Sequence, residues 1–228
     1  MHQIEFSKAS KEYIPGLKVL DGVSFNVEKG EFVFIVGPSG AGKSTIICLL
    51  IGEEKPTEGE IKFDGKSVSD VPHDEMPNLR RKIGVVFQDY KLLDSKTVYD
   101  NVVVALEVVG TDKEEINNII PNILSLVGLK NQKDYYPNQL SGGEKQRVAI
   151  ARALAHEPDV LIADEATGMI DPDSADGIVE ILEKINSLGT TVIMATHDER
   201  VVNSLKKRVI RLEKGKIISD KEGGNYRV

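Results

Sequence analysis

Short apolar runs alternate along the chain with longer stretches of helical spacing. The runs FVFIV (32–36), IGVVF (83–87), VLIAD (160–164) and TVIMAT (191–196) are rich in β-branched residues. Such nearly continuous apolar runs are typical of strands that are covered on both faces. Because helical stretches separate them, the pattern predicts an α/β fold with a mostly parallel sheet and helices on its faces.

Other segments depart from this pattern. Alternating apolar and polar residues in IEFSKAS (4–10), VSFNVEKG (23–30) and GEIKFDGK (59–66) predict an antiparallel β subdomain. RVIRLEKGKIIS (208–219) predicts two strands joined by a turn at Gly215.

Helical spacing at 97–109 and 114–129, between two core strands, predicts an inserted α-helical subdomain over about residues 90–155. We therefore predict one domain over residues 1–228. Its nucleotide-binding core would comprise residues 1–89 and 156–228.

Composition narrows the class of protein. With 29 basic and 36 acidic residues among 228, the net charge of -7 argues against a nucleic-acid-coating surface, which needs clustered Lys and Arg. No apolar run approaches the roughly 20 residues of a membrane span, and the start MHQIEFSKAS lacks the apolar centre of a secretory signal. We therefore expect a cytoplasmic protein. The single cysteine, Cys48, excludes an internal disulfide.

A phosphate-binding loop is the strongest chemical signal. GPSGAGKS (37–44) satisfies the Walker A pattern and lies between an apolar strand and a helix, the context that the motif needs. Its glycines let successive amides point at phosphate, and the helix amino terminus adds a favourable dipole. Lys43 should reach the β and γ phosphates, Ser44 should ligate Mg²⁺, and Thr45 should contact the α phosphate. The predicted ATP-binding residues of this segment are Gly37, Pro38, Ser39, Gly40, Ala41, Gly42, Lys43, Ser44 and Thr45.

A second motif, LSGGEKQR (140–147), follows in the chain. Ser141 and the backbone at Gly142 and Gly143 can donate hydrogen bonds to a phosphate at the start of a helix. This sequence matches the signature motif of the ABC ATPases, so the chain resembles that family. In the family the motif binds nucleotide held by the opposite subunit. The resemblance therefore implies an ATP-dependent homodimer in which Ser141, Gly142, Gly143 and Glu144 act in trans.

Polar side chains also follow the later apolar strands. Asp164 and Glu165 in VLIADE resemble Walker B and the catalytic glutamate of the family, which implies that Asp164 holds Mg²⁺ and Glu165 is the general base. His197 in MATHD matches the family's switch histidine, which contacts the γ phosphate and the attacking water. Gln88 in GVVFQ matches the Q-loop glutamine, which approaches nucleotide and Mg²⁺.

Two further residues are assigned by resemblance. Tyr13 falls where the family places an aromatic ring that stacks on adenine, and Asp171 matches an aspartate that couples the two composite sites. The segment DEATGMIDP departs from the family, with Ala166 in place of the usual proline and with Met169 and Ile170 where close relatives favour Asn and Leu. Because of this departure, the sequence does not predict how strongly the two composite ATP sites are coupled.

Within the family, FQDYKLL, TVYDNV and the tail RVIRLEKGKIISDKEGGNY are most similar to the ABC ATPases of bacterial cell division. Those proteins pair with a membrane protein and pass the ATP cycle to activators of peptidoglycan hydrolases. The resemblance implies an ATPase that lies on the inner face of the cell membrane through its partner. Subunits of lipoprotein-release and macrolide-export systems share almost all these residues and stay open as alternatives. So does a dimerisation switch that hydrolyses little ATP.

The partner should be contacted beside the Q-loop. Exposed Tyr and Leu side chains next to a moving loop suit a helix-in-groove contact. Burial of these side chains within the chain is the competing explanation. The residues concerned are Asp89, Tyr90, Lys91, Leu92 and Leu93.

Overall fold

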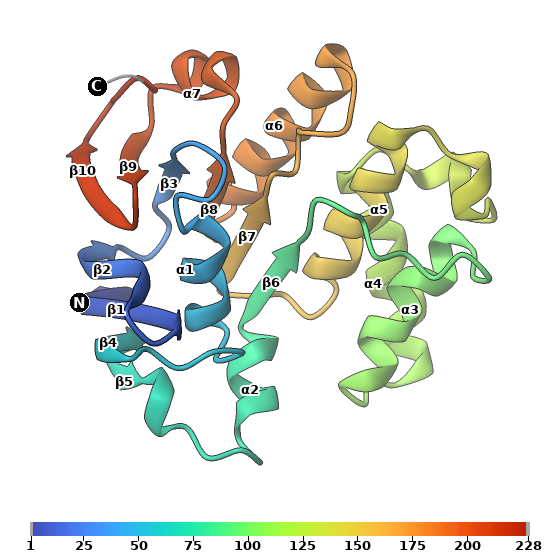
Figure 1. Ribbon diagram of the computed structural model, residues 1–228. Helices are drawn as coiled ribbons and strands as arrows, with labels where there is room; N and C mark the ends of the chain where they lie inside the picture. Colours follow the sequence, from blue (N-terminus) through green and yellow to red (C-terminus); the bar gives the residue numbers. More distant parts are fainter. Residues whose placement is uncertain (1, 227–228) are drawn as a thin grey trace.

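The computed structural model describes residues 2–226, and two β-sheets organise this part of the chain (Figure 1). The larger sheet is parallel except for one edge strand. Its order is β10 (Lys216–Lys221), β9 (Arg208–Glu213), β3 (Phe32–Val36), β8 (Thr191–Thr196), β7 (Val160–Asp164) and β6 (Ile83–Val86). The predicted parallel sheet and its carboxyl-terminal hairpin are both confirmed.

The smaller sheet is antiparallel throughout, as the alternating segments predict. Its order is β2 (Leu17–Val27), β1 (Ile4–Ile14), β4 (Glu58–Phe63) and β5 (Lys66–Ser67). The first helix, α1 (Lys43–Leu50), shares one hydrophobic cluster with both sheets. This cluster fixes the smaller sheet next to the helix that follows the phosphate-binding loop.

Strand β3 shows why the parallel strands are apolar on both faces. Its five residues are all buried. Val33 and Ile35 pack in the cluster with α1 and the smaller sheet, whereas Phe34 packs in the cluster formed with the other helices. Side chains of a strand alternate between the two faces of a sheet, so both faces of this sheet are covered.

Six further α-helices follow α1 in the described part of the chain. They are α2 (Met76–Arg81), α3 (Val98–Val108), α4 (Lys113–Leu126), α5 (Gly142–Leu154), α6 (Pro172–Ser187) and α7 (Glu199–Leu205). Helices α3 to α5 fall within the predicted helical insertion and stand beside the sheet (Figure 1). One continuous cluster, which includes Val102, Ile120, Ile150 and Leu161, joins them to it. The division into a core and a helical subdomain therefore stays a prediction.

The site is placed by the ends of the parallel strands. In an open α/β sheet, ligands bind outside the carboxyl ends of the strands. Strand β3 leads into the segment Gly37–Gly42, β6 leads to Gln88, β7 leads to Glu165 and β8 leads to His197. No helix within residues 2–226 combines the length and the apolar character that crossing a membrane requires.

Candidate nucleotide site

The loop between β3 and α1 has a shape that favours glycine at three positions, Gly37, Gly40 and Gly42. A methyl group built on Gly37 would lie 2.1 Å from the Leu212 carbonyl oxygen, so the backbone approaches strand β9 too closely for a side chain. Gly40 has open space around it but a φ of +78°, which side chains rarely adopt. These constraints fold the loop back over the start of α1, as a phosphate cradle requires.

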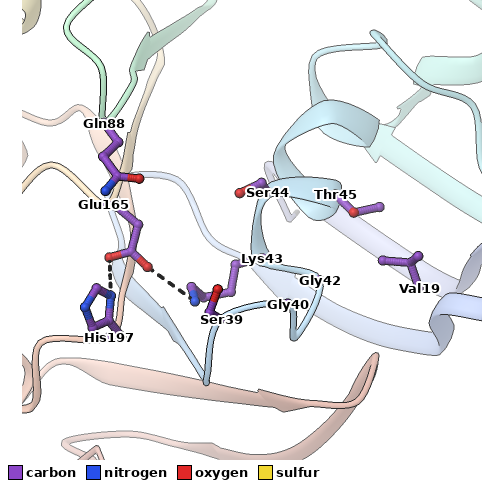
Figure 2. A pocket seen from close by; sticks show the side chains of 10 residues that line it. All are labelled: Val19, Ser39, Gly40, Gly42, Lys43, Ser44, Thr45, Gln88, Glu165 and His197. Atoms are coloured by element: carbon purple, nitrogen blue, oxygen red, sulfur yellow. Dashed lines mark hydrogen bonds and ion pairs between the residues drawn. The ribbon is translucent and has the colours of Figure 1, made fainter. Parts of the chain in front are cut away.

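Lys43 lies inside this cradle. Its ammonium donates to the Gly37 carbonyl oxygen at 2.9 Å and to the Pro38 carbonyl oxygen at 3.3 Å. It also forms an ion pair with Glu165, with Nζ 3.3 Å from Oε1 (Figure 2). The cation is thus held where the loop, α1 and the end of β7 meet, and a bound phosphate would compete with Glu165 for it.

Glu165 joins Lys43 to His197. Its second oxygen, Oε2, lies 2.7 Å from His197 Nδ1 (Figure 2). The backbone of Glu165 is in the left-handed region, with a φ of +52°, and its amide donates to the Ala195 carbonyl oxygen at 2.8 Å. Non-glycine residues seldom adopt this conformation, which is often found at functional sites. The carboxylate is therefore aimed at the cradle by a constrained backbone, as a general base must be.

Asp164 provides the second carboxylate. Its Oδ2 accepts a hydrogen bond from the Ser44 hydroxyl at 3.0 Å, and its Oδ1 is buried with no hydrogen-bond partner among the described residues. Burial raises the pKa of Asp164, against the opposing effect of the Ser44 hydrogen bond. A buried carboxylate oxygen without a partner, next to a hydroxyl, fits the hydrated Mg²⁺ that accompanies a nucleotide.

Magnesium would also depend on the nucleotide itself. Within residues 2–226 there is no cluster of three His, Cys, Asp or Glu side chains that could hold a metal ion. Ser44 and Asp164 would therefore share the ion with phosphate oxygens, which is how Mg²⁺ usually binds in phosphoryl-transfer proteins. Gln88 borders the same cavity and can reach this region.

A cavity of about 320 Å³ brings these groups together except Asp164, which does not line it and connects to it through the Ser44 hydroxyl. It brings together predicted residues from four loops and adds Val19 of β2, which the sequence analysis missed because an apolar strand residue carries no functional signal. Tyr13 does not border the cavity; it is half exposed, and the Lys11 ammonium lies 5.1 Å from the centre of its ring. Gly37, Pro38 and Ala41 shape the loop without lining the cavity. The lining residues are Val19, Ser39, Gly40, Gly42, Lys43, Ser44, Thr45, Gln88, Glu165 and His197.

The signature motif lies elsewhere, at the start of α5. Ser141 is the N-cap of this helix and forms a capping box with Glu144. A methyl group built on Gly143 would lie 2.6 Å from Ser174 Oγ on α6, so this glycine is needed for close packing. None of the described signature residues lines the cavity that holds Lys43. One protomer therefore does not bring its own signature motif to its own cradle.

The segment between β7 and α6 carries Asp171. Asp171 is the N-cap of α6 and accepts a hydrogen bond from the Ser174 amide at 2.9 Å. The Ser174 side chain, and after it this amide, lowers the pKa of Asp171. Ala166 is buried, Ile170 packs against the core, and Met169 is 60% exposed. The geometry gives Asp171 a capping role, and its coupling role stays a prediction.

The segment expected to meet a partner is only partly at the surface. Asp89, Lys91 and Leu93 are exposed, whereas Tyr90 and Leu92 are partly buried, and Leu92 packs against the core. The competing explanation, burial within the chain, therefore applies to Tyr90 and Leu92.

Comparisons with known proteins agree with this geometry. The family described as ABC transporter matches residues 20–168. The chain is 50% identical to the cell division ATP-binding protein FtsE of Bacillus subtilis, with 98% of each chain covered. It is 43% identical to the FtsE of Escherichia coli, with 93% of this chain and 96% of that protein covered.

Solved structures give the same result. A dimeric post-hydrolysis state of the ATP-binding cassette MJ0796, bound to ADP and Pi, superposes with a TM-score of 0.86 at 36% identity. That match covers 97% of this chain and 99% of the other. CbiO1 of Clostridium perfringens, part of the ABC transporter complex cbiONQ, superposes with a TM-score of 0.89 at 34% identity. It covers 97% of this chain and 89% of that one.

Proposed function

Because this chain belongs to the ABC transporter family of ATP-binding proteins, we propose that it hydrolyses ATP as a dimer to drive a membrane partner in cell division. The partner would resemble FtsX, the membrane protein that FtsE-type ATPases serve. Relatives named FtsE align over nearly their full length, which supports this choice over lipoprotein-release or macrolide-export subunits.

One observation carries the enzymatic part of the proposal. The Glu165 carboxylate lies between the Lys43 ammonium and the His197 ring, at the mouth of a phosphate cradle. When the γ-phosphate binds the Lys43 ammonium, the Glu165 carboxylate loses this ion pair and is free to accept a proton from water. His197 orients the carboxylate. A protein that only binds nucleotide as a switch has no need for a base in this position.

Phosphate release by the purified protein, alone and with its membrane partner, tests this step. We expect turnover that falls by at least about 100-fold in Glu165→Gln, since loss of a general base typically costs 10²–10⁴ in rate. The variant should still bind ATP, because it keeps the cradle. Turnover equal to that of the variant would favour the switch hypothesis.

The position of the signature motif supports a composite site. Ser141 and Gly142 do not line the cavity of their own protomer, so a second copy must supply this motif to a bound nucleotide. In Glu165→Gln with MgATP we expect a stable dimer, because unhydrolysed triphosphate keeps both halves joined. Light scattering that detects only monomer at saturating ATP would contradict the composite site.

A groove between α2 and α3 supplies a surface for the partner. Its volume is about 380 Å³, and its floor is apolar, formed by Pro77, Val104, Ala105, Val108 and Val109. Val108 is 74% exposed. The rim is basic because of Arg80, Arg81 and Arg152, with no acidic residue among those that line the groove. His156 also lines it, and burial lowers the pKa of its ring. An amphipathic helix with acidic flanks fits such a groove.

We infer that this groove receives a cytoplasmic helix of the membrane partner. Asp89, Lys91 and Leu93 are the exposed residues of the loop that Arg152 of the groove holds by its backbone. Val108→Glu tests this assignment, because it places a charge on the apolar floor at a position that is exposed in the free protein. We expect loss of co-purification with the partner and an unchanged melting temperature. Val104 is less suitable because it is less exposed. Retained binding by Val108→Glu would exclude the groove.

The location of the protein follows from this partner. The chain would lie on the inner face of the cell membrane when the partner is present and would be released from it otherwise. Fractionation of cells with and without the partner gene checks this expectation.

A further inference from the structure

The loop that follows Gln88 is held in place by one side chain of α5. Arg152 donates from Nη2 to the Tyr90 carbonyl oxygen at 2.9 Å and from Nη1 to the Lys91 carbonyl oxygen. Tyr90 and Lys91 have φ values of +50° and +47°, which residues with side chains seldom adopt. A fork that grips two consecutive carbonyl groups keeps the loop in this unusual shape.

Arg152 lies near no carboxylate partner among the described residues. No residue within 2–226 forms an ion pair with it, and burial lowers the pKa of its guanidinium. The two loop carbonyl groups are therefore its main polar partners. Arg152 also borders the groove between α2 and α3, so a helix that fills the groove would touch the same guanidinium.

The side chain of Tyr90 extends from this loop to the start of α5. A methyl group built on Gly142 would lie 3.2 Å from the Tyr90 hydroxyl oxygen and 3.3 Å from Ile170 Cγ2. The Tyr90 ring therefore reaches the first residue of α5, directly after Ser141. Its backbone is held by Arg152 while its hydroxyl lies against the signature motif.

We propose that Arg152 and Tyr90 form a relay that carries occupancy of the groove to the signature turn, and so to the nucleotide held by the opposite protomer. The relay deepens the proposed function, and it rests on that function for the composite site and for the identity of the groove's occupant. Gln88, on the same loop, faces the cavity of its own protomer. The loop after β6 thus contacts both composite sites. Gln88 lies at the nucleotide cavity of its own protomer, and Tyr90 lies against the signature turn that would serve the other protomer's nucleotide.

The chain provides a matched control for Arg152. Arg80 borders the same groove and also donates to two consecutive carbonyl oxygens, those of Ile51 at 3.0 Å and Gly52 at 3.2 Å. Its partners follow α1 and do not belong to the loop after β6. Lysine keeps the charge at either position but cannot supply the planar fork that grips two carbonyl groups. Arg152→Lys and Arg80→Lys therefore differ only in which loop is released.

The first test needs no partner. In a Glu165→Gln background with MgATP, we expect Arg152→Lys to raise the protein concentration at half-dimerisation about tenfold, within the usual range of coupling between sites. ATP affinity, measured at protein concentrations at which only monomer is present, should stay unchanged. Tyr90→Phe keeps the ring and removes only the hydroxyl group, and we expect a rise of about threefold. Arg80→Lys should dimerise as its parent does.

The second test places a 3-fluorotyrosine at position 90 and follows its fluorine resonance when the membrane partner is added in detergent. We expect a shift in the parent and in Arg80→Lys and none in Arg152→Lys. Unchanged dimerisation of both Arg152→Lys and Tyr90→Phe, or an equal loss in Arg80→Lys, overturns the relay. If dimerisation changes as expected but the parent shows no shift with the partner, the relay stands and the proposed occupant of the groove is wrong.

Discussion

The contact between the signature helix and α6 allows a prediction with a calculable cost. In Gly143→Ala the new methyl group would lie 2.6 Å from Ser174 Oγ and 2.7 Å from Ser174 Cβ. An ordinary contact between such atoms is about 3.5–4.0 Å, so the two helix amino termini must separate by about 1 Å. Overpacking of this kind costs about 1–3 kcal/mol.

The change in stability of Gly143→Ala depends on two opposing effects, overpacking and helix propensity. Alanine improves helix propensity over glycine by up to about 1 kcal/mol, which offsets part of the overpacking. We therefore expect a net loss of about 0–3 kcal/mol in the unfolding free energy of the monomer. For a protein of this size each kcal/mol lowers the melting temperature by roughly 2–4 °C. Dimerisation with MgATP should suffer more, because the displaced turn carries Ser141.

The assay is a double-mutant cycle between Gly143→Ala and Ser174→Gly. Ser174→Gly removes the atoms that the methyl group would meet and keeps the backbone amide that Asp171 caps. We expect the pair to recover most of the loss of Gly143→Ala in both thermal unfolding and dimerisation. Gly142→Ala is the control for stability, since its methyl group would lie no closer than 3.2 Å to any neighbouring atom, the nearest being the Tyr90 hydroxyl oxygen, with the Met169 carbonyl oxygen at an ordinary 3.5 Å. Additive effects of the two changes would refute the close-contact argument.

Three shorter predictions concern the cradle and the core. Lys43→Ala should abolish ATP binding in calorimetry, and an unchanged affinity would remove the cradle assignment. Asp164→Asn should raise the melting temperature at neutral pH: burial raises the pKa of Asp164, so its charged form destabilises the fold above that pKa. The advantage should vanish as the pH falls below the unfolded pKa of about 3.9, and an advantage that persists in acid would contradict this cause. Ile150→Ala should lower the unfolding free energy by about 2–5 kcal/mol in urea titrations, because Ile150 is fully buried between α5 and the sheet.

Local pattern was sufficient for most of the fold. FVFIV forms a strand that is buried on both faces, and the segments around Phe25 and Phe63 form the antiparallel sheet. The order of strands in the larger sheet could not be read from the sequence in the same way. Which strands become neighbours depends on crossovers between distant segments, such as the pairing of β3 with β8.

The site was predictable wherever its residues follow buried strands. Gln88, Glu165 and His197 all meet at the cavity because parallel strands end at the same edge. Contacts across helices were not predictable. Ser174, which belongs to no motif, lies against Gly143 of the signature motif, and Tyr90 lies against Gly142; only the packed structure brings these residues together.

The start of α5 explains why a single protomer is incomplete. The capping box uses the Ser141 hydroxyl to satisfy the Glu144 amide, and the first-turn amides of Gly142 and Gly143 have no acceptor within the helix. These amides sit at the positive end of the helix dipole, where an anion is favoured. The chain's own cradle is lined by other residues, so we propose that the anion at this turn is the terminal phosphate of a nucleotide held by a second copy. In this proposal, loss of that phosphate would remove the group shared by both copies, so hydrolysis would separate them and pass the conformational change to a partner.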